Sequence, residues 1–214
     1  MAVELLIIGS SGLAKETAQL ARQIDPGCDR WDRISYVAED AASLGSAMPY
    51  GAVRYTDADL PALDRRVDVA VAIGYPQPRR RVAQELTAHP LFDFPNLVHP
   101  SVQIDPLFVT LGRGNMVCKG VVLTCDIAIG DFNLINWNVT VGHDTRVGSF
   151  CVINPGSNLS GNVRLGDGCL LGTGSQVLER LTLEAGSIIG AGAVVTRSTA
   201  LAGTYVGIPA RKVE

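Results

Sequence analysis

The sequence lacks the features that mark a nucleic-acid-binding, membrane or secreted protein. Charged residues make up only 18% of the chain, and the net charge of −3 gives no basic excess for binding nucleic acid or an anionic membrane. No apolar run approaches the length of a membrane span. No basic segment precedes the apolar run at Val3–Ile8, so we expect no secretory signal. These absences predict a cytoplasmic protein with no membrane span and no nucleic-acid partner.

Metal-binding side chains are also scarce. The cysteines show no metal-ligand spacing; they are Cys28, Cys118, Cys125, Cys151 and Cys169. The only histidines are His89, His99 and His143. A metal-dependent hydratase would need about three histidines converging on one site, and only His143 lies in the repeat described next. We therefore expect no metal.

What the sequence does contain is an aliphatic residue at every sixth position from Leu111 to Leu201. The series is Leu111, Val117, Leu123, Ile129, Ile135, Val141, Val147, Ile153, Leu159, Leu165, Leu171, Val177, Leu183, Ile189, Val195 and Leu201. A fixed short period is typical of a solenoid, in which each repeat buries its apolar face against its neighbours. Three such hexads would close one triangular coil, so the series predicts a parallel β-helix of about five coils.

Two further features of each hexad support this interpretation. The residue two positions before the aliphatic is usually small or β-branched, and would enter the interior beside it. Cys151 and Cys169 occupy this position, where a thiol packs as a small hydrophobe. Glycine often follows the aliphatic, as at Gly142 and Gly166, which suits a corner with positive φ or a close approach of two backbones.

The residues before the repeat alternate between strand and helix patterns. Residues 3–9 read as a buried strand, Gly9–Gly12 as a turn, and residues 13–24 as a helix. Further strands are expected at 33–37, 68–73 and 94–98, and a helix at 79–86. This alternation predicts an α/β unit over residues 1–98, followed by the β-helix and a C-terminal tail over 99–214.

The first strand–turn–helix offers a site for phosphate, because a helix start presents free backbone N–H groups. Gly9, Ser11 and Ala14 occupy the three positions of the dinucleotide fingerprint, and the second is not glycine. Glu39 or Asp40, after the second strand, would hold ribose hydroxyls. The competing interpretation is an ordinary βα turn.

The order of the two units and the motif Gly-Ser-Ser-Gly-Leu-Ala-Lys-Glu at 9–16 carry a family resemblance. The chain resembles the hexapeptide-repeat acyltransferases of the sialic acid O-acetyltransferase and nucleotide-aminosugar N-acetyltransferase family, which open with Gly-x-x-Gly-His-Ala-Lys-Glu. The resemblance implies a Rossmann-like small domain and a left-handed parallel β-helix. It also implies a nucleotide-sugar site; its residues here would be Gly9, Ser11, Gly12, Leu13, Glu39 and Gly74. The chain departs from the family pattern at Leu13, Ala38 and Val152.

His143 is the candidate catalytic base. Histidine side chains in general titrate near neutrality, which suits removal of a proton from an attacking amine or hydroxyl, and Asp144 would orient the ring. Gly161 lies one coil further on, and the resemblance implies that its N–H stabilises the oxyanion. Asn136 matches a polar site residue of the family. The alternatives are a solvated corner histidine and a corner asparagine that accepts an awkward backbone angle.

The resemblance further implies that acetyl-CoA binds in a groove between β-helices of a homotrimer. Gly161, Thr173 and Ala191 would contact it through their backbones. Arg211 and Lys212, in a closing Gly-Ile-Pro-Ala-Arg-Lys stretch, would bind its phosphates; otherwise they form a solubilising basic tail.

The resulting hypothesis is an acetyl-CoA-dependent acetyltransferase that acts on a nucleotide-linked amino sugar by direct transfer, in polysaccharide biosynthesis. One alternative is an O-acetyltransferase acting on a sugar hydroxyl of sialic acid or a polysaccharide precursor. A second is a non-catalytic protein that binds nucleotide sugar or CoA.

Overall fold

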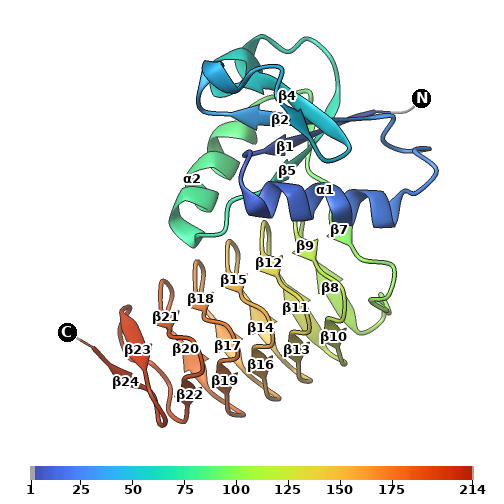
Figure 1. Ribbon diagram of the computed structural model, residues 1–214. Coiled ribbons are helices and arrows are strands. Elements are labelled where there is room, and N and C mark those ends of the chain that lie inside the picture. Colours follow the sequence, from blue (N-terminus) through green and yellow to red (C-terminus); the bar gives the residue numbers. More distant parts are fainter. Residues whose placement is uncertain (1–2, 214) are drawn as a thin grey trace.

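The computed structural model describes residues 3–213, and its N-terminal part is an α/β unit built on one six-stranded sheet, sheet A (Figure 1). Its strands are β1 (Glu4–Ile8), β2 (Arg33–Ala38), β3 (Ala47–Met48), β4 (Gly51–Thr56), β5 (Val67–Val71) and β6 (Phe92–Asp93), in the order β3-β4-β2-β1-β5-β6. All neighbouring pairs are parallel except β3 with β4. Strands β1 and β5 are buried throughout because helices cover both faces of the sheet.

The two helices confirm the expected strand–helix alternation. Helix α1 (Gly12–Ile24) buries Ala14, Ala18 and Ala21, whose small side chains allow close packing on the sheet. Helix α2 (Pro76–Leu86) packs on the opposite face and starts earlier than predicted. Its first residue is Pro76, which suits a helix start because the N–H that proline lacks has no partner there. Short 3₁₀ segments lie at η1 (Ala41–Ser43) and η2 (Asp57–Ala62).

Two details of this unit differ from the sequence prediction. Strands β3 and β4 were not predicted; the burial of side chains along β4 does not alternate regularly, and a register shift interrupts its pairing with β2. The predicted strand at 94–98 is wrong as an element of sheet A. Strand β6 ends at Asp93, Pro95 follows, and β7 (Leu97–Val98) pairs instead with the first coil of the β-helix. The chain therefore passes into the β-helix slightly before residue 99.

The second part of the chain is a parallel β-helix with three sheets. Sheet B contains β7, β9 (Met116–Val117), β12 (Leu134–Ile135), β15 (Val152–Ile153), β18 (Leu170–Leu171), β21 (Ile188–Ile189), β23 (Thr204–Val206) and β24 (Arg211–Lys212). Sheet C contains β8 (Val109–Leu111), β11 (Ile127–Ile129), β14 (Arg146–Val147), β17 (Arg164–Leu165) and β20 (Thr182–Leu183). Sheet D contains β10 (Val122–Leu123), β13 (Thr140–Val141), β16 (Asn158–Leu159), β19 (Gln176–Val177) and β22 (Val194–Val195). Successive coils pair in a constant register, as at Thr140↔Asn158 and Arg146↔Arg164.

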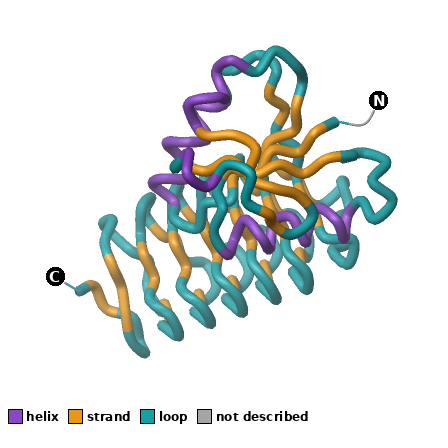
Figure 2. Tube along the Cα trace, turned by 45° about the horizontal axis from the view of Figure 1, so that its top comes forward, coloured by secondary structure: helices purple, strands orange, loops and turns teal. Residues whose placement is uncertain are grey.

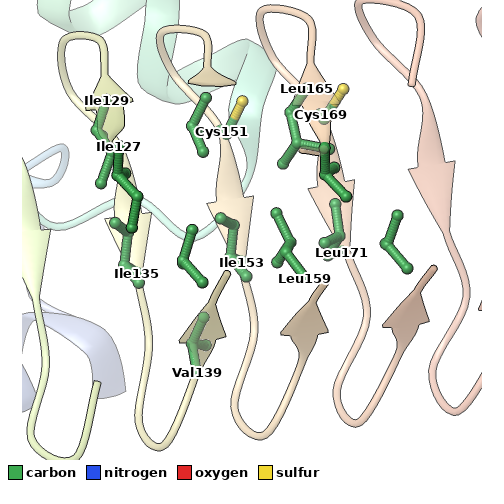
Figure 3. Close-up of a cluster of buried hydrophobic side chains, with 14 of the residues drawn as sticks. Ile127, Ile129, Ile135, Val139, Cys151, Ile153, Leu159, Leu165, Cys169 and Leu171 are labelled. Atoms are coloured by element: carbon green, nitrogen blue, oxygen red, sulfur yellow. The ribbon is translucent and has the colours of Figure 1, made fainter. Parts of the chain in front are cut away.

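The interior confirms the hexad pattern. Every aliphatic of the series from Val117 to Val195 is buried, and the interior side chains form rows along the axis (Figure 3). Cys151 and Cys169 lie in these rows with no exposed surface. Polar interior groups are paired with one another, as where the Ser175 hydroxyl donates to that of Ser157 at 3.2 Å. Within residues 3–213 no buried side-chain nitrogen or oxygen lacks a hydrogen-bond partner.

The corners explain the glycines. Positive φ recurs three positions after every aliphatic from Leu111 to Ile189, as at Phe132, Asp144 and Gly168. The glycines directly after the aliphatics have ordinary φ and are required by close approach instead. A Cβ on Gly142 would lie 2.7 Å from the backbone nitrogen of Gly161 in the next coil.

The repeat ends earlier than the sequence series suggests. Leu201 is 64% exposed, so its assignment as an interior position is wrong. The chain leaves the coil after β22. Strand β23 then pairs Thr204 with Ile188, and the sequence separation of this pair is two residues shorter than that of Ile188 and its partner Leu170 in the preceding coil. Strand β24 folds back antiparallel on β23 and closes the end of the helix.

The α/β unit covers one face of the β-helix. Helix α1 lies on the outer side of sheet B over β7, β9 and β12, where its Thr17 hydroxyl lies 3.5 Å from the Met116 sulfur (Figure 1). The later coils project beyond the α/β unit (Figure 2). Sheets C and D, and the corner between them, lie away from it. No helix among the described residues has the length and hydropathy to cross a membrane.

Candidate active site

His143 and Asp144 lie on the corner between sheets C and D, which we call the C–D corner. The corner follows β13, and the coils on either side hold its backbone. The Asn162 N–H donates to the His143 carbonyl at 2.6 Å, and the Asp144 N–H donates to the Cys125 carbonyl at 3.1 Å. Asp144 adopts a left-handed φ of 60°, a conformation that short polar side chains tolerate. The two side chains are therefore presented to solvent from a fixed backbone.

The imidazole is oriented by its neighbour. Nδ1 of His143 lies 2.7 Å from the Asp144 carboxylate, with both side chains more than half exposed. A carboxylate accepts from Nδ1–H, so this contact favours the tautomer whose lone pair is on Nε2. The arrangement leaves Nε2 available to take a proton from an attacking group.

Gly161 lies against the free edge of the imidazole, as the repeat register predicts. A Cβ at this position would meet Nε2 of His143 at 2.5 Å, so any larger residue would displace the ring. The Gly161 N–H makes no hydrogen bond to another residue within 3–213. The corner thus combines a proton acceptor and an unused backbone donor on adjacent coils.

Asn136, Thr173 and Ala191 lie on a different corner, between sheets B and D (the B–D corner). Thr173 and Ala191 are exposed one coil apart, and neither N–H donates to a described residue. Asn136 is buried, and its side-chain oxygen accepts from the Trp137 N–H at 2.9 Å. The structure does not bring these three residues to His143 within one chain. Their predicted roles remain predictions.

The predicted nucleotide residues lie at the carboxyl ends of the strands of sheet A. Gly9 follows β1 and Gly74 follows the segment after β5. These strands are neighbours, whereas β2 lies on the other side of β1. The strand order reverses here, and such a switch point is where open α/β sheets bind ligands. Ser11 precedes α1 without capping it, so the N–H groups of the first turn, from Gly12 onward, have no side-chain cap.

The three departures from the family pattern have distinct surroundings. Leu13 lies beside Gly74, whose Cβ, if present, would be 3.7 Å from a Leu13 methyl group. Ala38 is buried in β2, and the exposed Glu39 follows it. Val152 is fully buried against the α/β unit, so a ligand has no access to it.

Arg211 and Lys212 form β24 and are exposed at the end of sheet B. Strand β24 lies at the C-terminal end of the β-helix, past β18 and β21, whereas β13 and β14, which flank His143, lie several coils earlier (Figure 1). The contact of Arg211 and Lys212 with CoA phosphates remains a prediction.

Contacts between the two units leave the C–D corner separate from the α/β unit. The α/β unit contacts sheet B and the two corners that flank it, through Thr17 on Met116, Arg80 on Asp167, and the lining of a small pocket that includes Trp137. In a triangular coil the C–D corner is the one opposite sheet B. His143 therefore lies on the corner opposite sheet B, away from the predicted nucleotide residues of the same chain.

Two features of the structure lie near Gly74. A cavity of about 580 Å³, open to solvent, lies between the start of α2 and the outer face of sheet B. Tyr75, which follows Gly74, lines it together with Leu170 and Ile188. Arg79 is completely buried at the junction of the two units. Arginine is rarely buried, and only the three-dimensional fold brings its partners to it. No group of three or more potential ligand side chains within the described part of the chain could hold a metal ion.

No family model and no curated protein matches the chain. Among solved structures, PerB from Caulobacter crescentus, in complex with CoA and GDP-perosamine, is 32% identical with a TM-score of 0.88, covering 99% of this chain and 97% of that one. The acetyltransferase domain of PglB from Neisseria gonorrhoeae is 29% identical with a TM-score of 0.90, covering 98% and 99%. WeeI from Acinetobacter baumannii is 26% identical with a TM-score of 0.86, covering 99% and 100%.

Proposed function

Because this chain belongs to the hexapeptide-repeat sugar N-acetyltransferases, we propose that it transfers the acetyl group of acetyl-CoA to the amino group of a nucleotide-linked amino sugar. PerB, which matches 99% of this chain, is in complex with CoA and GDP-perosamine, and the PglB domain has been solved with acetyl-CoA. The observation in this chain that carries the proposal is the pairing of an oriented imidazole with a free N–H, at His143 and Gly161.

The chemistry follows from that pairing. Nε2 of His143 takes the proton of the attacking amine while the nitrogen bonds to the thioester carbon, and Asp144 stabilises the imidazolium that forms. The Gly161 N–H donates to the carbonyl oxygen as it becomes negative, and CoA leaves as the thiol. The base contributes about 10²–10⁴-fold, and alignment of the two substrates supplies roughly 7–11 kcal/mol of the barrier. No covalent enzyme intermediate is needed.

We assign the nucleotide to the switch point of sheet A, which acts as a Rossmann-like site. The N–H groups at the start of α1 would bind a phosphate, and Glu39 after β2 would bind ribose hydroxyls. The GDP-perosamine bound to PerB supports a nucleoside diphosphate as the part of the substrate that this site binds. The five cysteines are all free thiols, which fits a reducing compartment such as the cytoplasm.

Within a single chain, the proposed nucleotide site and His143 lie apart. We therefore infer that the complete site forms between chains. Each β-helix is a triangular prism. If three copies each turn the same face toward a threefold axis, the two corners of that face lie beside the two neighbouring copies. If that face is sheet D, the C–D corner of one copy meets the B–D corner of the next. His143 then lies beside the next copy's Asn136, Thr173 and Ala191. The α/β unit, on sheet B, borders the same junction.

The side chains on the three faces favour sheet D for this role. Its outward residues carry no charge; they are Val122, Thr140, Asn158, Gln176 and Val194. The Thr140 hydroxyl donates to Asn158 at 2.6 Å, and Asn158 donates to Gln176 at 3.1 Å. Sheet C instead exposes Arg146 and Arg164 in register, which would repel their copies around an axis. Interface cores are depleted of charge, so sheet D suits a homotrimer.

The proposal is tested by incubating the protein with acetyl-CoA and a panel of nucleotide amino sugars while free thiol is measured. Each amino sugar is paired with the nucleotide sugar that has a hydroxyl in place of the amine. We expect thiol release with at least one amine and not with its hydroxyl partner. Release with hydroxyl sugars alone would make the protein an O-acetyltransferase. Binding of both ligands without release would make it a non-catalytic binding protein.

A further inference from the structure

Arg79, in the first turn of α2, spans the junction between the two units. Among the residues that the structure describes, its guanidinium makes hydrogen bonds only to backbone carbonyls. On the α/β side, Nη1 donates to Val71 at 2.7 Å and to Ile73 at 3.0 Å. On the β-helix side, Nε donates to Phe132 at 2.6 Å and Nη2 to Asn133 at 3.4 Å.

No carboxylate in residues 3–213 is paired with this guanidinium, whose side chain has no exposed surface. Burial lowers the pKa of Arg79 to about 9, which still leaves it protonated at neutral pH. A buried charge without an ion-pair partner is costly, and four carbonyl dipoles are the compensation that the fold provides. A neutral apolar side chain would avoid burying a charge, but it would leave these carbonyls without the donor that joins the two units.

The segments that carry the acceptors differ between the two sides. Val71 ends β5, and Ile73 directly precedes Gly74, one of the proposed nucleotide residues. Phe132 and Asn133 belong to a rigid corner. The Asn133 side chain donates to Asn115 at 3.0 Å and accepts from the Cys151 N–H at 2.7 Å, which ties three coils together. Arg79 thus connects the segment that carries Gly74 to a corner whose hydrogen bonds tie three coils together.

We propose that Arg79 is a positioning residue, which holds the Ile73–Gly74 segment at a fixed place over the β-helix and so aligns the nucleotide sugar for transfer. The proposal rests on the proposed function, because it concerns where the nucleotide is held. Arg79 has no exposed surface and touches neither substrate. A displacement of about 1 Å in a bound substrate can cost ~10²-fold in rate, so loosening this segment should lower kcat and raise KM for the nucleotide sugar. Acetyl-CoA, assigned to other corners, should bind as before.

The experiment compares Arg79→Met, Arg79→Lys and Arg66→Met with the wild type. Methionine keeps the length but donates no hydrogen bond, and lysine keeps the charge but cannot reach carbonyls on both sides in the guanidinium geometry. Arg66 is the matched control, because it is a surface arginine of the same unit, 74% exposed and 3.7 Å from Asp93. Amide hydrogen exchange of residues 71–76 is measured with kcat and KM for both substrates, and the Tm verifies folding.

We expect faster exchange at 71–76 in Arg79→Met, with kcat/KM for the nucleotide sugar reduced about 10²-fold and the Kd for CoA unchanged. Arg79→Lys should lie between this variant and the wild type, and Arg66→Met should match the wild type. Folded Arg79→Met with wild-type exchange and kinetics would overturn the proposal. So would parallel losses for both substrates that only follow the folded fraction. If Arg79→Met does not fold, Arg79→Lys supplies the same readouts. If the wild type transfers no acetyl group, the proposed function fails, and the exchange data still decide whether Arg79 holds the segment.

Discussion

The separation of His143 from the nucleotide residues leads to a quantitative prediction about mixed trimers. One variant, His143→Ala, removes the base on the C–D corner. The other, Gly12→Glu, places a carboxylate where a phosphate is proposed to bind. Nothing lies within 4 Å of a Cβ at Gly12, and an acidic residue at a helix start favours the helix, so we expect this variant to fold. Each variant alone should be inactive, for a different reason.

The expected activity of mixed trimers follows from the cyclic arrangement of the three chains. In a cyclic trimer each junction joins the C–D corner of one copy to the α/β side of the next. Any ring that contains both variants has one junction at which an intact His143 faces an intact nucleotide site. Such trimers should therefore show about one third of the wild-type activity. If each site belonged to one chain, every chain would carry a defect, and the activity would be absent.

The assay uses co-expression of the two variants with different affinity tags and purification on both tags in succession, which retains only mixed rings. Thiol release from acetyl-CoA with the accepted nucleotide amino sugar is then measured per trimer. Light scattering gives the mass of the assembly. Mixed trimers without activity, or a monomer that is fully active, would refute the placement of the site between chains.

Other substitutions test the site and the fold separately. His143→Ala should lower kcat by about 10²–10⁴-fold with the Kd for CoA unchanged by calorimetry, and Asp144→Asn should lower it less; a drop in CoA affinity alone would contradict this role. Gly161→Ala puts a methyl group 2.5 Å from Nε2 and should lower kcat about 10²-fold, whereas Gly45→Ala, in open space with positive φ, should cost only ~1–2 kcal/mol of stability. The Trp31 N–H and two further backbone N–H groups donate to the Asp25 carboxylate and lower its pKa. The ionised carboxylate therefore stabilises the fold at neutral pH, and this stabilisation is lost when the group is protonated in acid. Asp25→Asn should lower Tm at pH 7, with the difference from the wild type shrinking below about pH 4; a constant difference would contradict this.

The β-helix could be predicted closely because its signal is local and periodic. Each hexad contributes one interior aliphatic and one small neighbour, so the register alone stacks Gly161 on His143. The prediction fails where the period continues in the sequence but the coil does not. Leu201 keeps the spacing of six, yet no further coil lies beyond it to bury its side chain.

The α/β unit was less predictable because long-range pairing decides its strands. Leu97 and Val98 look like any short apolar strand, and only the partner β9 places them in the β-helix. The arrangement of the site was out of reach for a similar reason. The sequence counts residues along the coil, and Asn136 is close to His143 by that count, but the two lie on different corners. The burial of Arg79 could not be predicted from the sequence, since its acceptors are backbone carbonyls from distant segments.

We propose that His143 promotes transfer of an acetyl group to a sugar nitrogen. The measurement follows isotope-labelled acetyl from acetyl-CoA into the product in a single turnover, with wild type and His143→Ala side by side. We predict that the label appears as an amide on the nucleotide-linked amino sugar with the wild-type enzyme, and that His143→Ala binds both substrates but forms the amide about 10²–10⁴-fold more slowly. Label found as an ester on oxygen, or equal rates for the two proteins, would contradict the claim.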